Sequence, residues 1–219
     1  MSAKYVLFDL DGTLTDPATG ITNAIMFALG AMGAEVPPRE SLYRFIGPPL
    51  SEAFAEFFPK ERIGEAIDTY RVYFRAQGMF ENAVYTGIPE LLRELKNRGI
   101  PTAVATSKPE GFAVTILEHF GLAEYFTVIG GADMEGLRGE KPQVIAYVLD
   151  RLGLSPENAD SCIMVGDRKF DMEGAAAFGM TSIGVTWGYG SRDELLSSGA
   201  QMTADTPHEL LDLILKQIQ

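Results

Sequence analysis

The segment of residues 5–15 constrains the fold of this chain more than any other stretch of the sequence. Its apolar beginning stops abruptly at Asp9 and Asp11, which are separated by one residue and followed by a glycine and a threonine. A short continuous apolar run is typical of a buried strand in a parallel sheet. Such sheets bind ligands at the carboxyl ends of their strands, where the two aspartates lie. Because buried carboxylates are costly unless they are paired or hold a cation, the segment predicts a ligand site, or otherwise a polar turn after a strand.

Three later segments carry polar side chains in comparable places. Residues 104–107 form an apolar run that ends in hydroxyl groups, and Lys141, followed by a proline, begins a predicted helix. A second apolar run, which starts at Cys162, ends in Asp167 and Asp171. In this order, together with the Asp-x-Asp-Gly-Thr segment, they resemble the four motifs of the haloacid dehalogenase (HAD) superfamily of phosphohydrolases. The resemblance covers nearly the whole chain, and four motifs in sequence are far more specific than any one of them.

Beyond residue 87 the sequence predicts an α/β fold. Helical and strand patterns alternate, and glycines follow predicted helices where a left-handed cap is expected. This alternation is typical of a Rossmann-like parallel sheet with right-handed crossovers. Strands are expected near 102–105, 127–129, 163–165 and 182–185, with a further short one near Met202. Helices are expected near 89–98, 110–120, 143–152, 172–178, 193–198 and 207–218.

An all-helical block lies between the first and the second motif. Apolar side chains recur there at helical spacing in residues 21–32, 51–58 and 63–77, with a Gly-Pro-Pro break at 47–49. By resemblance, such an insert is a C1-type cap domain. Residues 1–15 and 85–219 are then expected to form the HAD-like catalytic core and residues 16–84 the cap. The expected hinges are the crossings at 15–17 and 82–87, and closure of the cap would exclude water.

Composition disfavours several classes of function. The 219 residues carry a net charge of −12, which disfavours binding to nucleic acid or to an anionic membrane surface. No apolar stretch approaches the roughly 18 residues of a membrane span, and the N-terminus lacks a signal-peptide pattern, so a cytoplasmic protein is expected. The single cysteine, Cys162, lies in an apolar run and is expected to be inert. Neither His119 nor His208 lies in a catalytic pattern.

The resemblance implies a role for each acidic motif residue. Asp9 is the expected nucleophile, which forms an aspartyl-phosphate, and Asp11 is the expected general acid and base. Mg²⁺ is the expected cofactor, held by the side chains of Asp9 and Asp167 and by the backbone carbonyl of Asp11. Dehalogenases lack an aspartate at the second position of the first motif, so Asp11 favours phosphate chemistry.

Five further residues are expected to act on the substrate phosphate. The hydroxyl of Thr106 would donate to a phosphate oxygen, and the ammonium of Lys141 would stabilise the charge of the transition state. Gly12 lets the backbone approach the phosphate closely, and its neighbour Thr13 is a further substrate-binding candidate, as is Ser107. Taken alone, Thr106 would be an ordinary strand-end threonine and Lys141 a solvated lysine.

Supporting and specificity-determining residues are also expected. Asp171 lies one helical turn after Asp167 and would orient Lys141 or a metal-bound water, or else act as a charge at a helix N-terminus. In the helical block, Arg44 precedes the rigid Gly-Pro-Pro turn and is expected to reach a substrate phosphate or carboxylate. Three other residues of the block are weaker candidates, because a solvated helix face is their more common role: Arg71, Tyr73 and Arg75.

Three classes of function are compatible with the sequence. The first is a Mg²⁺-dependent phosphomonoesterase of a small soluble metabolite, a nucleoside 5′-monophosphate before 2-phosphoglycolate or a sugar phosphate. The segments around Arg168 and Lys169 and at 187–190 resemble the 5′-nucleotidase-like or phosphoglycolate-phosphatase-like subgroup. The second is a phosphomutase of the β-phosphoglucomutase kind, and the third is a phosphate-binding or regulatory module. A small phosphate monoester is the expected partner of a monomer or weak homodimer.

Overall fold

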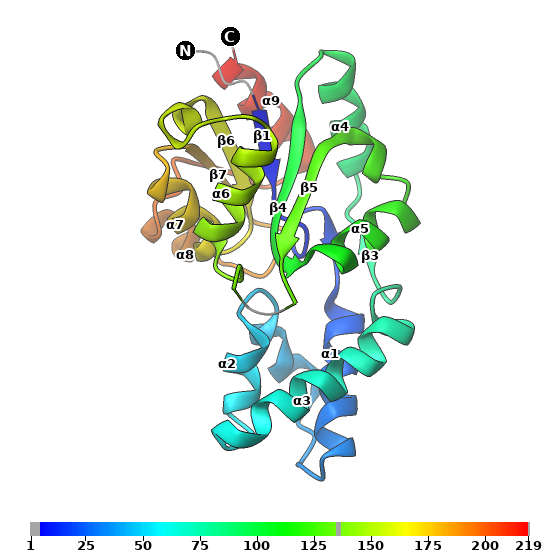
Figure 1. Cartoon of the computed structure of the whole chain (residues 1–219). Helices are drawn as coiled ribbons and strands as arrows, with labels where there is room; N and C mark the ends of the chain where they lie inside the picture. Colours follow the sequence, from blue (N-terminus) through cyan, green and yellow to red (C-terminus); the bar gives the residue numbers. More distant parts are fainter. Residues whose placement is uncertain (1–4, 135–136, 219) are drawn as a thin grey trace. The chain divides into compact units, whose positions relative to one another are not determined.

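The computed structural model describes residues 5–134 and 137–218. The chain divides into two compact units, whose elements are labelled in Figure 1. One unit combines the residues up to Thr15 with those from Val84 onward, and the other is the segment Asp16–Ala83.

The first unit is built on a six-stranded sheet. Its strands lie in the order β5-β4-β1-β6-β7-β8, and every described pairing between neighbours is parallel. The predicted α/β fold with a Rossmann-like sheet is therefore confirmed. The strands are β1 (Tyr5–Phe8), β4 (Thr102–Pro109), β5 (Phe126–Ala132), β6 (Cys162–Gly166), β7 (Thr181–Val185) and β8 (Met202–Ala204).

Helices cover both faces of this sheet. Val6, Leu7 and Phe8 of β1 are all completely buried, and successive side chains of a strand point to opposite faces. Leu7 belongs to a core cluster that includes Val144 and Val148 of α6. The helices are α4 (Ile88–Asn97), α5 (Glu110–His119), α6 (Lys141–Arg151), α7 (Lys169–Ala177), α8 (Arg192–Ser197) and α9 (Pro207–Ile218), with 3₁₀ helices η3 (Ala123–Tyr125) and η4 (Pro156–Ser161).

The strand order brings the carboxyl ends of three strands to one place. β1 lies between β4 and β6, with Leu7 opposite Ala103 on one side and opposite Met164 on the other. The end of β4 and the segments that follow β1 and β6 therefore meet at one edge of the sheet. β4 is longer than its sequence predicts. It runs to Pro109 because its pairing with β5 is irregular after Ala105 and then resumes.

The second unit is helical, as predicted. Its core contains the buried rings of Phe54, Tyr70 and Phe74, and the last two stack with ring centroids 5.4 Å apart. The backbone approaches closely at Gly20, where a Cβ would lie 1.9 Å from the carbonyl oxygen of Gly78. The elements are α1 (Ala18–Ala31), the 3₁₀ helix η1 (Arg39–Phe45), α2 (Leu50–Ala55), α3 (Lys60–Tyr73) and the π-helical turn η2 (Phe74–Gly78).

The chain passes from one unit to the other twice, at β2 (Thr15–Asp16) and β3 (Ala83–Val84). The two short strands pair as a two-stranded sheet. They fall within the segments 15–17 and 82–87, where hinges are expected from the sequence. Hinge motion there stays a prediction.

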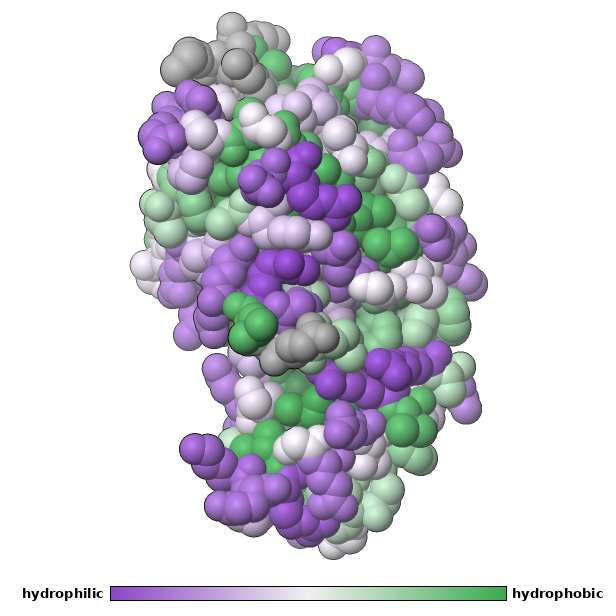
Figure 2. Space-filling view, viewed as in Figure 1, coloured by the Kyte–Doolittle hydropathy of each residue, from purple (hydrophilic) through white to green (hydrophobic). Residues whose placement is uncertain are grey.

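On the face shown in Figure 2, hydrophilic and hydrophobic residues are interspersed. Single exposed apolar residues of this kind are normal for folded proteins. Among the described residues, no helix combines the length and the apolar composition that a membrane span requires.

The packing of β1 gives a first testable expectation. Leu7→Ala removes a completely buried side chain from the core cluster and should lower the free energy of unfolding by about 2–5 kcal/mol. The same change at Leu196 of α8, which is 50% exposed, should alter it by no more than about 0.5 kcal/mol. Equilibrium urea unfolding measures both. Equal losses in the two variants would contradict the position of β1 in the core.

Candidate active site

Three carboxylates lie together where β1 and β6 end. Asp9 directly follows β1, Asp167 directly follows β6, and Asp171 lies in the first turn of α7. One carboxylate oxygen of each lies within 4.8 Å of the others. All three residues are buried by their neighbours, Asp167 completely. The adjacent positions of β1 and β6 thus join two motifs that are more than a hundred and fifty residues apart.

Lys141, the first residue of α6, binds this cluster directly. Its ammonium nitrogen Nζ lies 2.9 Å from Asp9 Oδ1 and 2.7 Å from Asp171 Oδ1, and it donates to the carbonyl oxygen of Ala105 at 3.0 Å. Gly174 of α7 makes room for it, since a Cβ there would lie 2.7 Å from Lys141 Cγ. The side chain is 3% exposed, so the structure excludes a solvated lysine.

The charge of Lys141 is fixed by its two carboxylate partners. Burial alone lowers the pKa of the ammonium group, but Asp171 and Asp9 outweigh burial and hold this pKa above its usual value. Asp171 also accepts from the backbone N–H of Arg168 at 3.1 Å. Asp171 therefore contacts Lys141 and also caps the start of α7. From the sequence, a contact with Lys141 and a charge at the helix N-terminus are alternatives, and the structure shows both contacts.

Two loops fix the orientation of Asp167. Its carboxylate accepts the backbone N–H of Tyr189 at 2.8 Å and the hydroxyl of Thr13 at 3.3 Å. Two glycines lie close to its side chain: a Cβ on Gly12 would lie 2.2 Å from Asp167 Oδ2, and a Cβ on Gly188 would lie 2.4 Å from Asp167 Cβ. Gly12 also has a φ of 84°, which favours glycine. The structure thus shows a close approach of Gly12 to Asp167, and the expected approach to a phosphate stays a prediction.

Thr13, a candidate for substrate binding in the sequence, is completely buried. Its hydroxyl donates to Asp167, and its carbonyl oxygen accepts from the indole N–H of Trp187 at 3.1 Å. These contacts make its side chain part of the support of Asp167. The segment that follows β7 therefore carries residues that hold the first and the fourth motif together, a contact that spacing along the sequence does not reveal.

Thr106 and Ser107 lie near the end of β4. Thr106 is buried, and its hydroxyl oxygen accepts from the backbone N–H of Lys108 at 3.2 Å, while Ser107 is half-buried. The side chain of Lys108 extends to the second aspartate of the first motif, with Nζ 2.5 Å from Asp11 Oδ2. Sequence reasoning missed Lys108. Alternate residues of a regular strand share a face, but the pairing of β4 with β5 is irregular between Ala105 and Pro109, so strand periodicity does not reveal this contact.

Residues 6–185 match a family model described as haloacid dehalogenase-like hydrolase. The chain belongs to this family. The resemblance inferred from the four motifs is thereby confirmed, and so is the predicted enzyme class, a hydrolase.

Similar proteins support this membership. A 5′-nucleotidase of Pseudomonas aeruginosa is 46% identical over 192 residues, which cover 87% of this chain and 86% of that protein. The tyrosine-protein kinase PtkA of Mycobacterium tuberculosis is 44% identical over 192 residues, which cover 88% of this chain and 65% of PtkA. The crystal structure of a predicted phosphatase from Clostridium acetobutylicum has a TM-score of 0.93 at 46% identity, and the match covers 99% of this chain and 100% of that one.

The side chains of three other residues that the sequence singles out in this HAD hydrolase pair with glutamates. Arg44 pairs with Glu56 within the helical unit at 2.5 Å, and its side chain is 60% exposed. Tyr73 donates to Glu81 in the same unit. Arg168 donates to Glu194 of α8 at 2.9 Å, so it anchors the start of α7 to α8.

Burial raises the pKa of two acidic groups in the cluster, Asp167 and Asp171. For Asp167 burial is the main cause, the carboxylates of Asp171 and Asp9 add to it, and the pKa lies well above its usual range. The pKa of Asp171 is raised to about 6, chiefly by burial and against the pull of Lys141. Clustered carboxylates that resist ionisation suit a hard divalent cation, which prefers oxygen ligands and relieves their repulsion. The donor set of the HAD hydrolase therefore fits a cation such as Mg²⁺.

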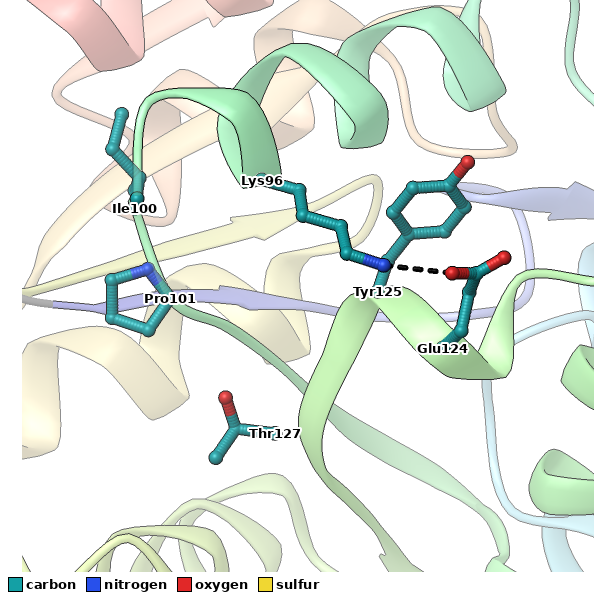
Figure 3. Close-up of a pocket in the computed structure, with 7 residues that line it drawn as sticks. Lys96, Ile100, Pro101, Glu124, Tyr125 and Thr127 are labelled. Atoms are coloured by element: carbon teal, nitrogen blue, oxygen red, sulfur yellow. Dashed lines mark hydrogen bonds and ion pairs between the residues drawn. The ribbon is translucent and has the colours of Figure 1, made fainter.

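A shallow pocket of about 240 Å³ lies at the opposite edge of the sheet, where β4 and β5 begin. Figure 3 shows Lys96 directed toward Glu124, with an ion pair of 2.7 Å between them. This pocket contains none of the motif residues.

The close packing around Asp167 predicts the effect of adding one methyl group. Gly188→Ala places a Cβ 2.4 Å from both Asp167 Cβ and the carbonyl oxygen of Gly12, and it should lower the free energy of unfolding by about 1–3 kcal/mol. Gly111→Ala in α5 meets no atom within 4 Å and should be neutral or stabilising by up to about 1 kcal/mol. Urea unfolding compares the two. A Gly188→Ala protein as stable as Gly111→Ala would contradict this packing.

The raised pKa of Asp167 predicts a dependence of stability on pH in the absence of divalent cations. The folded protein binds the proton of Asp167 more tightly than the unfolded chain does. The free energy of unfolding therefore falls as pH rises from about 4, the pKa of an aspartate in the unfolded chain, through the higher pKa of the folded state. Asp167→Asn removes this titration and should gain stability over the wild type progressively as pH rises toward neutrality. Urea unfolding in EDTA from pH 5 to pH 8 measures the difference. The Asp193→Asn change at an exposed residue is the control. A stability difference between Asp167→Asn and the wild type that stays constant with pH would contradict the raised pKa of Asp167.

Proposed function

We propose that this HAD-family phosphatase is a Mg²⁺-dependent phosphomonoesterase that acts through an aspartyl-phosphate on a small phosphorylated metabolite. The observation that carries the proposal is the position of Lys141, whose ammonium lies within 3 Å of both Asp9 and Asp171. The ammonium of Lys141 holds the carboxylate of Asp9 in place, and the same positive charge would stabilise phosphoryl oxygens.

The proposed metal ligands are the side chains of Asp9 and Asp167 and the backbone carbonyl of Asp11. The cation would neutralise the clustered carboxylates and polarise the phosphoryl group. The two loops that clamp Asp167 would keep its carboxylate in place for this task. Asp171 would act indirectly, because its carboxylate holds the ammonium of Lys141.

Asp9 and Asp11 would carry out two displacements. First, a carboxylate oxygen of Asp9 forms a bond to phosphorus, the bond from phosphorus to the ester oxygen breaks, and Asp11 gives that oxygen a proton. Then water attacks phosphorus, Asp11 accepts a proton from the water, and the bond to Asp9 breaks to release inorganic phosphate. Thr106 and the backbone around Gly12 and Ser107 would bind the phosphoryl oxygens.

Residues 16–84 are proposed to be the cap that selects the substrate, with Arg44 as its phosphate- or carboxylate-binding residue. A nucleoside 5′-monophosphate is the first substrate class, supported by the 46% identity to a protein named 5′-nucleotidase. 2-Phosphoglycolate and sugar phosphates are the second. The net charge of −12 agrees with a small-molecule substrate rather than a nucleic acid or an anionic membrane. The proposed protein is a monomer or weak homodimer in the cytoplasm.

Phosphoryl transfer to an acceptor other than water is a second candidate. It is supported by the 44% identity to PtkA, which is named a tyrosine-protein kinase. It includes a mutase of the β-phosphoglucomutase kind. The two outcomes differ in products, since hydrolysis releases inorganic phosphate stoichiometrically, whereas transfer leaves the phosphoryl group on the acceptor.

The test is a screen of the purified protein against nucleoside 5′-monophosphates, 2-phosphoglycolate and sugar phosphates, with Mg²⁺ and with EDTA. Phosphate release should require Mg²⁺, and Asp9→Asn should lower kcat by at least about 10³-fold because the nucleophile is lost. Asp193→Asn, the same change at an exposed site of the same unit, should leave kcat unchanged. Normal turnover by Asp9→Asn would overturn the proposal, and phosphate binding without turnover would favour a regulatory module.

A further inference from the structure

Lys108 and Asp11 form a buried ion pair beside the carboxylate cluster. Lys108 Nζ lies 2.5 Å from Asp11 Oδ2, and the side chains are only 5% and 13% exposed. Lysine is seldom buried unless its charge is paired, because desolvation of the ammonium is costly. This lysine is separate from Lys141, which contacts Asp9 and Asp171. The site therefore contains two buried lysines, each in contact with a different aspartate of the first motif.

The backbone that presents Lys108 is held from two sides. The pairing of β4 with β5 is irregular between Ala105 and Pro109, and irregularities of this kind re-aim side chains next to active sites. The N–H of Lys108 donates to the hydroxyl oxygen of Thr106 at 3.2 Å. On the other side, Gly131 of β5 packs so closely that a Cβ there would lie 2.5 Å from the carbonyl oxygen of Lys108.

The two carboxylate oxygens of Asp11 differ in their surroundings. Oδ2 is bound by Lys108, whereas Oδ1 is buried and has no hydrogen-bond partner among the described residues. Lys108 thus anchors one oxygen of Asp11, and the other oxygen has no hydrogen-bond partner among the described residues. This is the arrangement that a proton-transferring carboxylate needs, because fixing one oxygen sets the direction of the other.

We propose that Lys108 is a positioning residue for Asp11, and that through this contact it sets how well the enzyme cleaves esters with poor leaving groups. The inference rests on the proposed function, in which Asp11 gives the leaving oxygen its proton. Lys108 itself transfers no proton in this scheme. Without it, the Asp11 carboxyl would lose its preferred orientation, and proton transfer to the leaving oxygen would become slow.

The test compares kcat/KM for two substrates that differ in leaving group. An alkyl ester, such as a nucleoside 5′-monophosphate cleaved by the wild type, needs a proton on its leaving oxygen, whereas 2,4-dinitrophenyl phosphate does not. kcat/KM reports the steps up to departure of the leaving group, so hydrolysis of the aspartyl-phosphate does not obscure it. The variants are Lys108→Met, Lys108→Arg and Asp11→Asn. Lys96→Met is the matched control, since this lysine pairs with Glu124 at the opposite edge of the same sheet.

Lys108→Met should lower kcat/KM for the alkyl ester by about 10- to 100-fold, with less than about a threefold loss for the dinitrophenyl ester. Asp11→Asn should show the same selectivity to a larger extent, and Lys108→Arg should restore much of the alkyl activity because it keeps a cation. Lys96→Met should change neither value. If Lys108→Met does not fold, Lys108→Gln, which keeps a polar donor, takes its place.

Equal losses on both substrates would overturn the inference, because they would make Lys108 a phosphate ligand or a purely structural residue. Unchanged activity on both would overturn it as well. Failure of the proposed function is distinguishable. In that case the wild type hydrolyses neither ester, or Asp11→Asn loses activity on both esters alike.

Discussion

The structure of this site depends on one buried ammonium group. Lys141 Nζ contacts Asp9 after β1, Asp171 in α7 and the carbonyl oxygen of Ala105 in β4, and so connects three separate segments. Removing one partner of a buried ion pair typically costs about 3–5 kcal/mol, because the other charge is left uncompensated. In the proposed mechanism the same charge stabilises the phosphoryl group during its transfer. Stability and the proposed chemistry would therefore depend on one side chain.

Burial of the carboxylates of Asp167 and Asp171 in ionised form lowers the stability of the folded protein. Burial raises the pKa of Asp167 and Asp171, so each of them would gain by being protonated or by binding a cation. The chain nevertheless keeps Asp167 fixed through Gly12, Gly188 and the N–H of Tyr189. A group held rigidly in an unfavourable electrostatic environment is typical of a functional site.

Supporting contacts extend beyond the four motifs. The segment after β7 contacts Asp167 and Thr13, and the irregular end of β4 brings Lys108 to Asp11. Trp187, Tyr189 and Lys108 contact no phosphate in the proposed mechanism. They contact Thr13, Asp167 and Asp11, which support the site or take part in it.

The sequence by itself determined the parallel α/β sheet, the helical insert and the family, because apolar runs and helical spacing are local patterns and the four motifs occur in order. It also named Asp9, Asp167, Asp171 and Lys141, which the structure brings together. Only the tertiary structure decided that Thr13 supports Asp167 and that Lys108 contacts Asp11. These contacts join residues 154 and 97 positions apart and depend on a strand irregularity and on close backbone approaches, which no local pattern encodes.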